Sequence, residues 1–156
     1  MSTNVTITEA SESDAELIWE MQKVAFADLL EKYEDYDTSP ANETLDKVKS
    51  RFEDPYTYHY FIEAENQIVG ALRIIDRKSE ENKKLSQILI LPEFRRKGYA
   101  YSAIRRAENI HGSTGWELDT ILQEKSLRLM YESLGYRRTD YTRVVNYKMT
   151  LVGYEK

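Results

Sequence analysis

The chain has 156 residues, a formal net charge of −5 and no cysteine. This length predicts one domain over residues 1–156, and an apolar content of 41% is enough for a single hydrophobic core. Without cysteine the chain has no disulfide, thiol nucleophile or thiolate metal site. An acidic chain disfavours nucleic acid as the main partner. No apolar run approaches the about 20 residues of a membrane span.

Two further features narrow the class of protein. The first residues lack the charged and apolar regions of a signal peptide, so we expect a cytoplasmic protein that does not bind a membrane. His59 and His111 are the only histidines and lie far apart in the sequence, so no metal site is expected. Oligomeric state is open, with a homodimer as one option.

The first half of the chain is expected to form a strand, two helices and a hairpin. Ser11 to Asp14 match the [ST]-x-x-[DE] pattern that begins a helix, and apolar residues then follow at helical spacing. Glu65 to Gln67 form a turn between two β-prone runs. The expected elements are strand 5–9, helix 13–32, helix 43–52, strand 58–64 and strand 68–75.

The second half continues with alternating strands and helices. An apolar run ends at Leu91 and Pro92, and the segment from Ala100 to about His111 has helical periodicity. Strand 116–121, a helix that ends at Leu134 before Gly135, and strands 136–139 and 144–152 complete the chain. The order β-α-α-β-β-β-α-β-α-β-β requires an α/β fold with a mixed sheet and helices on both faces. The unit from Ile88 to Ile121 should be a right-handed parallel crossover.

A basic turn joins the strand that ends at Leu91 to the following helix. It consists of Arg95, Arg96, Lys97, Gly98, Tyr99 and Ala100. The first N–H groups of a helix lack intrahelical partners and face the positive end of the helix dipole, so this turn suits a phosphate. It is neither a Walker A loop nor a G-x-G-x-x-G loop, which occur nowhere in the chain. An ordinary basic turn is the alternative.

Two motifs in this order resemble those of the GCN5-related N-acetyltransferase (GNAT) family. The turn reads R-x-x-G-x-A, similar to the family's Q/R-x-x-G-x-G/A loop for the acyl-CoA pyrophosphate. The segment Leu129 to Tyr136 reads L-M-Y-E-S-L-G-Y, similar to the family's more specific L-Y-E-K-L-G-F signature. The resemblance implies acetyl-CoA as co-substrate, and two central strands that splay apart to admit its pantetheine arm.

The resemblance also implies roles for individual residues. Tyr131 would lie near the cofactor sulfur and act as a general acid, although its place on an apolar stripe also fits an ordinary core tyrosine. Glu124 stands where relatives often have an asparagine that contacts the cofactor, and a carboxylate cannot donate as an amide does. The pantetheine would bind the backbone of Leu89, Ile90 and Leu91, and the pyrophosphate would bind Arg95, Arg96, Lys97, Gly98, Tyr99 and Ala100.

The strand before the basic turn carries no acidic residue, so no general base is assigned. A relay of water molecules past Ser86 or Gln87 is one way to remove the proton from the acceptor amine. Glu117 and Asp119 on the next strand are expected to be solvated. The acceptor site of the family is bordered by the first two helices and their connection, here the acidic and aromatic segment 31–37. This segment would favour binding of a cationic amine. The alternative is that it is an ordinary solvated loop.

Taken together, these features predict an N-acetyltransferase that moves an acetyl group from acetyl-CoA to a primary amine of a small molecule or peptide. A non-catalytic acyl-CoA sensor of the same fold is the main alternative, favoured by the missing strand acid. A nucleotide-phosphate hydrolase has little support, because no Walker lysine or acidic metal pair is evident.

Overall fold

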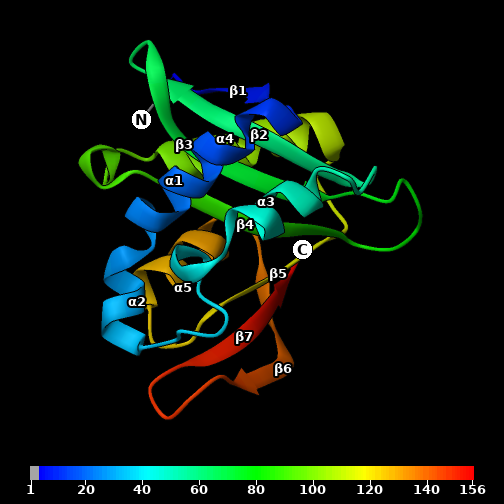
Figure 1. The fold of residues 1–156 in the computed structure, drawn as a ribbon. Helices are drawn as coiled ribbons and strands as arrows, with labels where there is room; N and C mark the ends of the chain where they lie inside the picture. Colours follow the sequence, from blue (N-terminus) through cyan, green and yellow to red (C-terminus); the bar gives the residue numbers. More distant parts are fainter. Residues whose placement is uncertain (1–3) are drawn as a thin grey trace.

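A computed structural model describes residues 4–156 of the chain (Figure 1). Its strands and helices, in chain order, are β1 (Thr6–Glu9), α1 (Ala15–Ala25), α2 (Ala27–Tyr33), α3 (Leu45–Arg51), β2 (Thr57–Ala64), β3 (Gln67–Ile75), β4 (Lys83–Ile90), α4 (Tyr99–His111), β5 (Trp116–Ile121), α5 (Lys125–Ser133), β6 (Arg137–Val144) and β7 (Thr150–Glu155). Short 3₁₀ turns cover Glu12–Asp14, Pro40–Asn42 and Pro92–Phe94. The predicted mixed α/β fold is confirmed.

The strands form one sheet in the order β1-β2-β3-β4-β5-β7-β6. Neighbouring strands are antiparallel except for β4 and β5, which run parallel, as expected for a strand–helix–strand unit. This parallel pairing is confined to two residue pairs, Lys83 with Trp116 and Lys84 with Glu117. Beyond them β4 and β5 separate, so the sheet opens from its middle, and the splay implied by the family resemblance is present.

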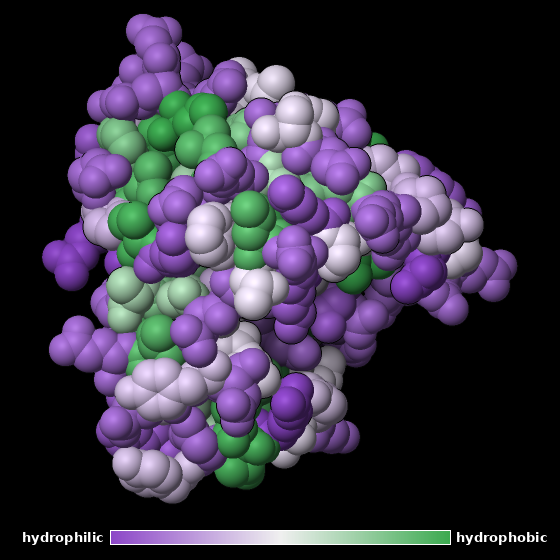
Figure 2. Space-filling model, in the orientation of Figure 1, coloured by the Kyte–Doolittle hydropathy of each residue, from purple (hydrophilic) through white to green (hydrophobic). Residues whose placement is uncertain are grey.

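Helices cover both faces of the sheet, and Figure 1 shows α1 and α3 in front of it with α4 behind. Side chains alternate along the strands, so each strand contributes to both layers. The layer under α4 contains Ile62, Leu72 and Leu85 against Ala103 and Ile104. The layer under α1 and α3 contains Phe61, Ala71 and Leu89 against Ile18, Met21 and Val48. Figure 2 shows mainly hydrophilic residues on the front surface, with apolar ones in separate groups.

The single helix expected over 13–32 is instead two helices. Phe26 leaves helical geometry, with φ −103° and ψ 6°, and α2 begins after it. The guanidinium of Arg95 donates to the carbonyl oxygen of Ala25 at 2.5 Å, at the break. A contact from a residue 70 positions away therefore marks the end of α1, and the local periodicity carries no sign of it.

The last two strands also differ from their expected ranges. Val144 ends β6 rather than beginning the final strand, and β7 starts only at Thr150. Between them the side chain of Asn146 accepts hydrogen bonds from the backbone N–H groups of Lys148 and Met149, both at 2.9 Å. This side-chain turn competes with the strand that the β-prone residues around it favour.

The far end of α4 is held by a buried chain of three polar side chains. The Tyr60 hydroxyl lies 2.7 Å from Nε2 of His111, and Nδ1 of His111 lies 2.7 Å from Oδ2 of Asp76. Burial alone would raise the pKa of Asp76, but hydrogen bonds from His111 and Lys78 lower it. The ionised carboxylate thus stabilises the junction of α4, β2 and β3.

We expect Asp76→Asn to lower the free energy of unfolding at pH 7 by about 1.5–3 kcal/mol, the range for a hydrogen bond to a charged group. The folded pKa of Asp76 is depressed, so its contribution is present above the unfolded pKa of about 3.9 and is lost as pH falls through the folded pKa. Urea unfolding at pH 7 and at about pH 3 should show the difference from wild type shrinking in acid. Asp37→Asn, on an exposed loop, is the control, and equal differences at both pH values would contradict this role.

Candidate functional site

The opening between β4 and β5 is the main structural feature that could receive a ligand. From Leu85 onward β4 keeps its pairing with β3 but has none with β5. Leu89 and Ile90 lie on this part of β4, and Leu91 follows directly. Gly70 lets β3 approach closely there, because a Cβ at that position would lie 2.1 Å from the Leu89 carbonyl oxygen. On its other side this part of β4 has no partner strand, and an extended ligand can pair with such a free strand edge.

The basic turn lies at the end of β4 and leads into α4. Arg96 and Gly98 both have left-handed backbone conformations, with φ 64° and 80°. Within residues 4–156, the backbone N–H groups from Arg96 to Tyr101 donate to no acceptor. Arg96, Lys97 and Gly98 are exposed. A left-handed turn followed by a helix N-terminus gathers unpaired N–H donors at one place, which is the arrangement that binds phosphate oxygens.

The side chains of the turn are less available than the sequence indicates. Arg95 points back into the protein, where it donates to the Ile90 carbonyl at 3.2 Å, to Asp28 at 3.0 Å and to the Ala25 carbonyl. It therefore ties the end of β4 to the junction of α1 and α2. Its guanidinium is engaged by these protein groups rather than held free for a phosphate.

A carboxylate on the β2–β3 turn engages two more residues of this loop. Glu65 accepts from Lys97 Nζ at 3.2 Å and from the Tyr99 hydroxyl. These hydrogen bonds lower the pKa of Glu65, and the same carboxylate raises the pKa of Tyr99. Among the three cations of the turn, Arg96 alone has no hydrogen-bonded or ion-pair partner within residues 4–156.

Tyr131 lies on α5 and is 7% exposed. Its ring packs edge-on against Tyr136, with the ring centroids 6.0 Å apart, and belongs to the core layer that includes Leu118. Burial raises the pKa of its hydroxyl to about 12, so the group is protonated at neutral pH. The hydroxyl donates to no acceptor within residues 4–156. Tyr131 thus combines a core ring with an unused donor.

Glu124, directly before α5, is joined to α2. Its carboxylate accepts from Lys32 Nζ at 2.7 Å and from the Tyr33 hydroxyl at 2.5 Å. Burial would raise the pKa of Glu124, but these two hydrogen bonds lower it. The Tyr33 carbonyl also accepts from Asn146 at 2.9 Å, on the loop between β6 and β7. As a result, α2 connects the two halves of the opened sheet.

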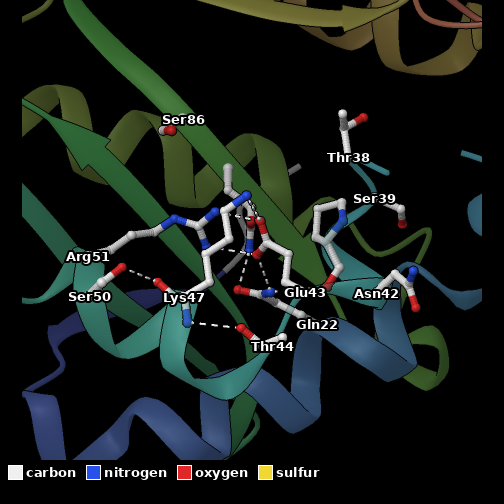
Figure 3. A network of polar contacts seen from close by, with 12 residues as sticks. Gln22, Thr38, Ser39, Asn42, Glu43, Thr44, Lys47, Ser50, Arg51 and Ser86 are labelled. Atoms are coloured by element: carbon white, nitrogen blue, oxygen red, sulfur yellow. Dashed lines mark hydrogen bonds and ion pairs between the residues drawn. The ribbon is translucent and has the colours of Figure 1, made fainter. Parts of the chain in front are cut away.

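A polar cluster under α1 and α3 was missed by the sequence analysis. Figure 3 shows Gln22 and Arg51 converging on the carboxylate of Glu43. Arg51 binds both carboxylate oxygens, at 2.8 and 2.5 Å, and Gln22 donates at 2.9 Å. Gln22 also accepts from Gln87 on β4 at 3.2 Å. A buried glutamine on the otherwise apolar face of α1 was the signal that could have revealed this cluster.

The acidic segment between α2 and α3 is partly committed to its own loop. Asp35 is buried and accepts from the backbone and hydroxyl of Thr38. Glu34 pairs with Lys148. On β5, Glu117 and Asp119 are exposed as expected. Within residues 4–156, no group of three or more His, Asp or Glu side chains is arranged to hold a metal ion, and no helix is long and apolar enough to cross a bilayer.

Solved structures of acetyltransferases share this fold across nearly the whole chain. The spermidine N-acetyltransferase from Vibrio cholerae in complex with CoA and spermine is 17% identical, with TM-score 0.72, covering 96% of this chain and 94% of that one. The ribosomal-protein-S18-alanine N-acetyltransferase from Escherichia coli is 11% identical, with TM-score 0.73, covering 97% and 92%. The PaiA N-acetyltransferase from Thermoplasma acidophilum in complex with coenzyme A is 14% identical, with TM-score 0.67, covering 98% and 99%.

Sequence comparison identifies the family directly. No curated protein matches the chain in sequence. The family model of the acetyltransferase (GNAT) domain, however, matches residues 29–156, which include the opening, the basic turn and α5. The chain therefore belongs to the GNAT acetyltransferase domain family and is an acetyl-CoA-dependent acyltransferase.

Proposed function

We propose that this protein transfers the acetyl group of acetyl-CoA to a primary amine of a small molecule or peptide by direct attack of the amine on the thioester. The observation that carries the proposal is the basic turn at the end of the opened strand, with its run of unpaired N–H groups. These donors suit the CoA pyrophosphate, and the edge of β4 that has no partner strand from Leu85 onward suits the amide groups of the pantetheine arm. Within Leu89 to Leu91, the Ile90 carbonyl already accepts from Arg95 and the Leu91 N–H donates to the Val69 carbonyl.

In the reaction, the amine nitrogen bonds to the thioester carbon and the carbon–sulfur bond then breaks. The amine loses a proton and the departing sulfur gains one. Alkyl amines have a pKa near about 10.4, so the acceptor must be deprotonated before it attacks. Ser86 and Gln87 are hydrogen-bonded to Arg73 and Gln22 respectively, so we assign neither as the base and propose that a water molecule carries this proton away.

Tyr131 is the proposed general acid. Its free hydroxyl and its protonated state at neutral pH both suit donation to the departing sulfur. Its pKa of about 12 lies above the about 8.5 of a thiol in water, which alone would make full proton transfer unfavourable. A thiolate that formed beside the buried Tyr131 hydroxyl would also be poorly solvated, and this would raise the pKa of the thiol toward that of the tyrosine.

The Gly98→Val variant tests the pyrophosphate site. Valine is strained at a φ of 80° and places a branched side chain among the N–H donors, so CoA affinity should fall at least about tenfold, or about 1.4 kcal/mol, by calorimetry. Gly115→Val is a matched control, because Gly115 has φ 78° but lies in the loop before β5. Equal CoA affinity in Gly98→Val and wild type, with both folded, would count against the site.

Two neighbouring arginines should differ in what they contribute. Arg96→Ala should weaken CoA binding more at low than at high ionic strength, because the exposed guanidinium acts through screened attraction. Arg95→Ala should mainly lower the unfolding temperature, because it removes the contacts to Asp28 and to the Ala25 and Ile90 carbonyls. Calorimetry at two salt concentrations and thermal unfolding separate the two effects. A salt-dependent loss in Arg95→Ala with unchanged stability would reverse these roles.

Tyr131→Phe tests the general acid. It should lower kcat about 100-fold, equivalent to roughly 2.7 kcal/mol of barrier, and leave CoA affinity nearly unchanged. Tyr136→Phe is the control, because that hydroxyl is buried and unpartnered within residues 4–156 and packs beside Tyr131. Normal turnover by Tyr131→Phe would make Tyr131 a core residue only. If neither wild type nor variant consumed acetyl-CoA with any amine, the non-catalytic sensor would be the better description.

A further inference from the structure

A row of polar residues crosses the sheet under α1 and α3, in a layer that is otherwise apolar. His59 on β2 pairs with Arg73 on β3, and Arg73 pairs with Gln87 on β4. Two residues along each strand, the same layer contains Phe61, Ala71 and Leu89. Polar groups in a buried layer are costly unless they are hydrogen-bonded, so this row needs a physical explanation.

Arg73 is half-buried, and its guanidinium has few partners in the protein. Its only hydrogen bond within residues 4–156 goes to the Ser86 hydroxyl at 3.3 Å, although a guanidinium has five N–H donors. No carboxylate in the described chain lies within ion-pair distance of it. Glu43 attracts Arg73 from a distance, but both of its oxygens are bound by Arg51.

The charge of this cluster is therefore not balanced. Arg51 and Arg73 contribute two positive charges, and Glu43 contributes one negative charge. Burial, together with the charge of Arg51, lowers the pKa of Arg73 to about 10, which still leaves it charged at neutral pH. A half-buried cation with so few partners in the protein can bind a ligand of opposite charge, so the site favours an additional anion.

A small cavity lies beside Arg73. Its volume of about 10 Å³ has room for about one water molecule, or one carboxylate oxygen, and its polar walls are Gln22, His59, Arg73 and Gln87. His59 stacks on Phe52, and its buried Nε2 has no partner within residues 4–156. Burial lowers the pKa of His59 to about 4, so this ring adds no charge near neutral pH.

The cavity lies next to the opening of the sheet. Gln87 of β4 lies directly beside Arg73 of β3. On its other side, β4 has already parted from β5 at this position. Neighbouring strands are about 4.8 Å apart, so Arg73 is one strand away from the edge along which the thioester arm would lie. A molecule with an amine and a carboxylate a few bonds apart can span the distance between Arg73 and this edge.

We propose that Arg73 binds the carboxylate of the acceptor, and that the acceptor is an amino acid rather than a polyamine. This inference rests on the proposed N-acetyltransfer and specifies its substrate class. The carboxylate would supply the anion that Arg73 lacks, with one oxygen in the cavity and the amine toward the opening. A polyamine would instead bring further positive charge toward Arg51 and Arg73, which costs binding energy through like-charge repulsion.

Acceptors that differ only in the carboxylate test this proposal on the wild-type protein. The matched pairs are ornithine and putrescine, lysine and cadaverine, and arginine and agmatine. Spermidine, the common amino acids and the α-amides of those amino acids are tested as further acceptors. In a productive pair, kcat/KM for the amino acid should be at least about tenfold higher than kcat/KM for the amine that lacks the carboxylate. This is the scale of one charge-assisted hydrogen bond. Equal or faster turnover of the carboxylate-free amines would overturn the proposal and leave N-acetyltransfer intact.

Arg73→Gln should remove this preference. The variant should raise KM for the amino acid, bring its kcat/KM down to that of the amide, and leave CoA affinity by calorimetry unchanged. Arg77→Gln, which removes the same charge from an exposed position, is the control. If Arg73→Gln does not fold, Arg73→Lys keeps the charge but loses the two-pronged donor geometry and should still raise KM for the amino acid alone.

The outcomes separate this inference from the proposed function. An unchanged preference for the carboxylate in folded Arg73→Gln and Arg73→Lys would overturn the role of Arg73, while N-acetyltransfer would stand. If CoA binds but wild type consumes no acetyl-CoA with any acceptor, the proposed function fails, and the substrate class fails with it.

Discussion

The separation of β4 from β5 after two residue pairs is the constraint on which the rest of this structure depends. A sheet is held together by its backbone hydrogen bonds, and strands that part in its middle leave edge groups without partners. Such groups need either water or a ligand. The end of β4, the basic turn and α5 lie in the part of the chain where the two strands separate, so the feature that weakens the sheet also provides the proposed binding site.

Other contacts compensate for the lost strand pairing. Glu124 binds Lys32 and Tyr33 of α2, and Asn146 binds the Tyr33 carbonyl, so α2 links the part of the sheet after the opening to the part before it. Arg95 fixes the start of α2 to the end of β4. Changes in α2 should therefore affect the width of the opening as well as local stability.

The polar clusters differ in how completely their hydrogen-bonding groups are satisfied, and this difference separates the structural cluster from those proposed to bind ligands. Asp76, His111 and Tyr60 satisfy one another in a closed chain, which suits a structural role. Arg73 and His59 retain unused polar atoms beside a cavity, and the N–H groups of the basic turn are likewise unpaired. Tyr131 stands between these cases, because its ring is packed in the core while its hydroxyl is free.

The sequence by itself determined the order of the strands, and of the helices apart from the break at Phe26, because apolar periodicity and turn residues are local signals that each segment carries. It also located the basic turn and Tyr131, because both lie in short continuous motifs. Only the tertiary structure decided which of those residues are free. Arg95 belongs to the turn by sequence, yet its side chain binds residues 67 and 70 positions earlier. The break at Phe26, the joining of Glu124 to α2, and the unpaired charge of Arg73 likewise depend on contacts between distant segments. Periodicity describes which face of a helix or strand is buried, but it cannot show which polar groups the folded chain brings together.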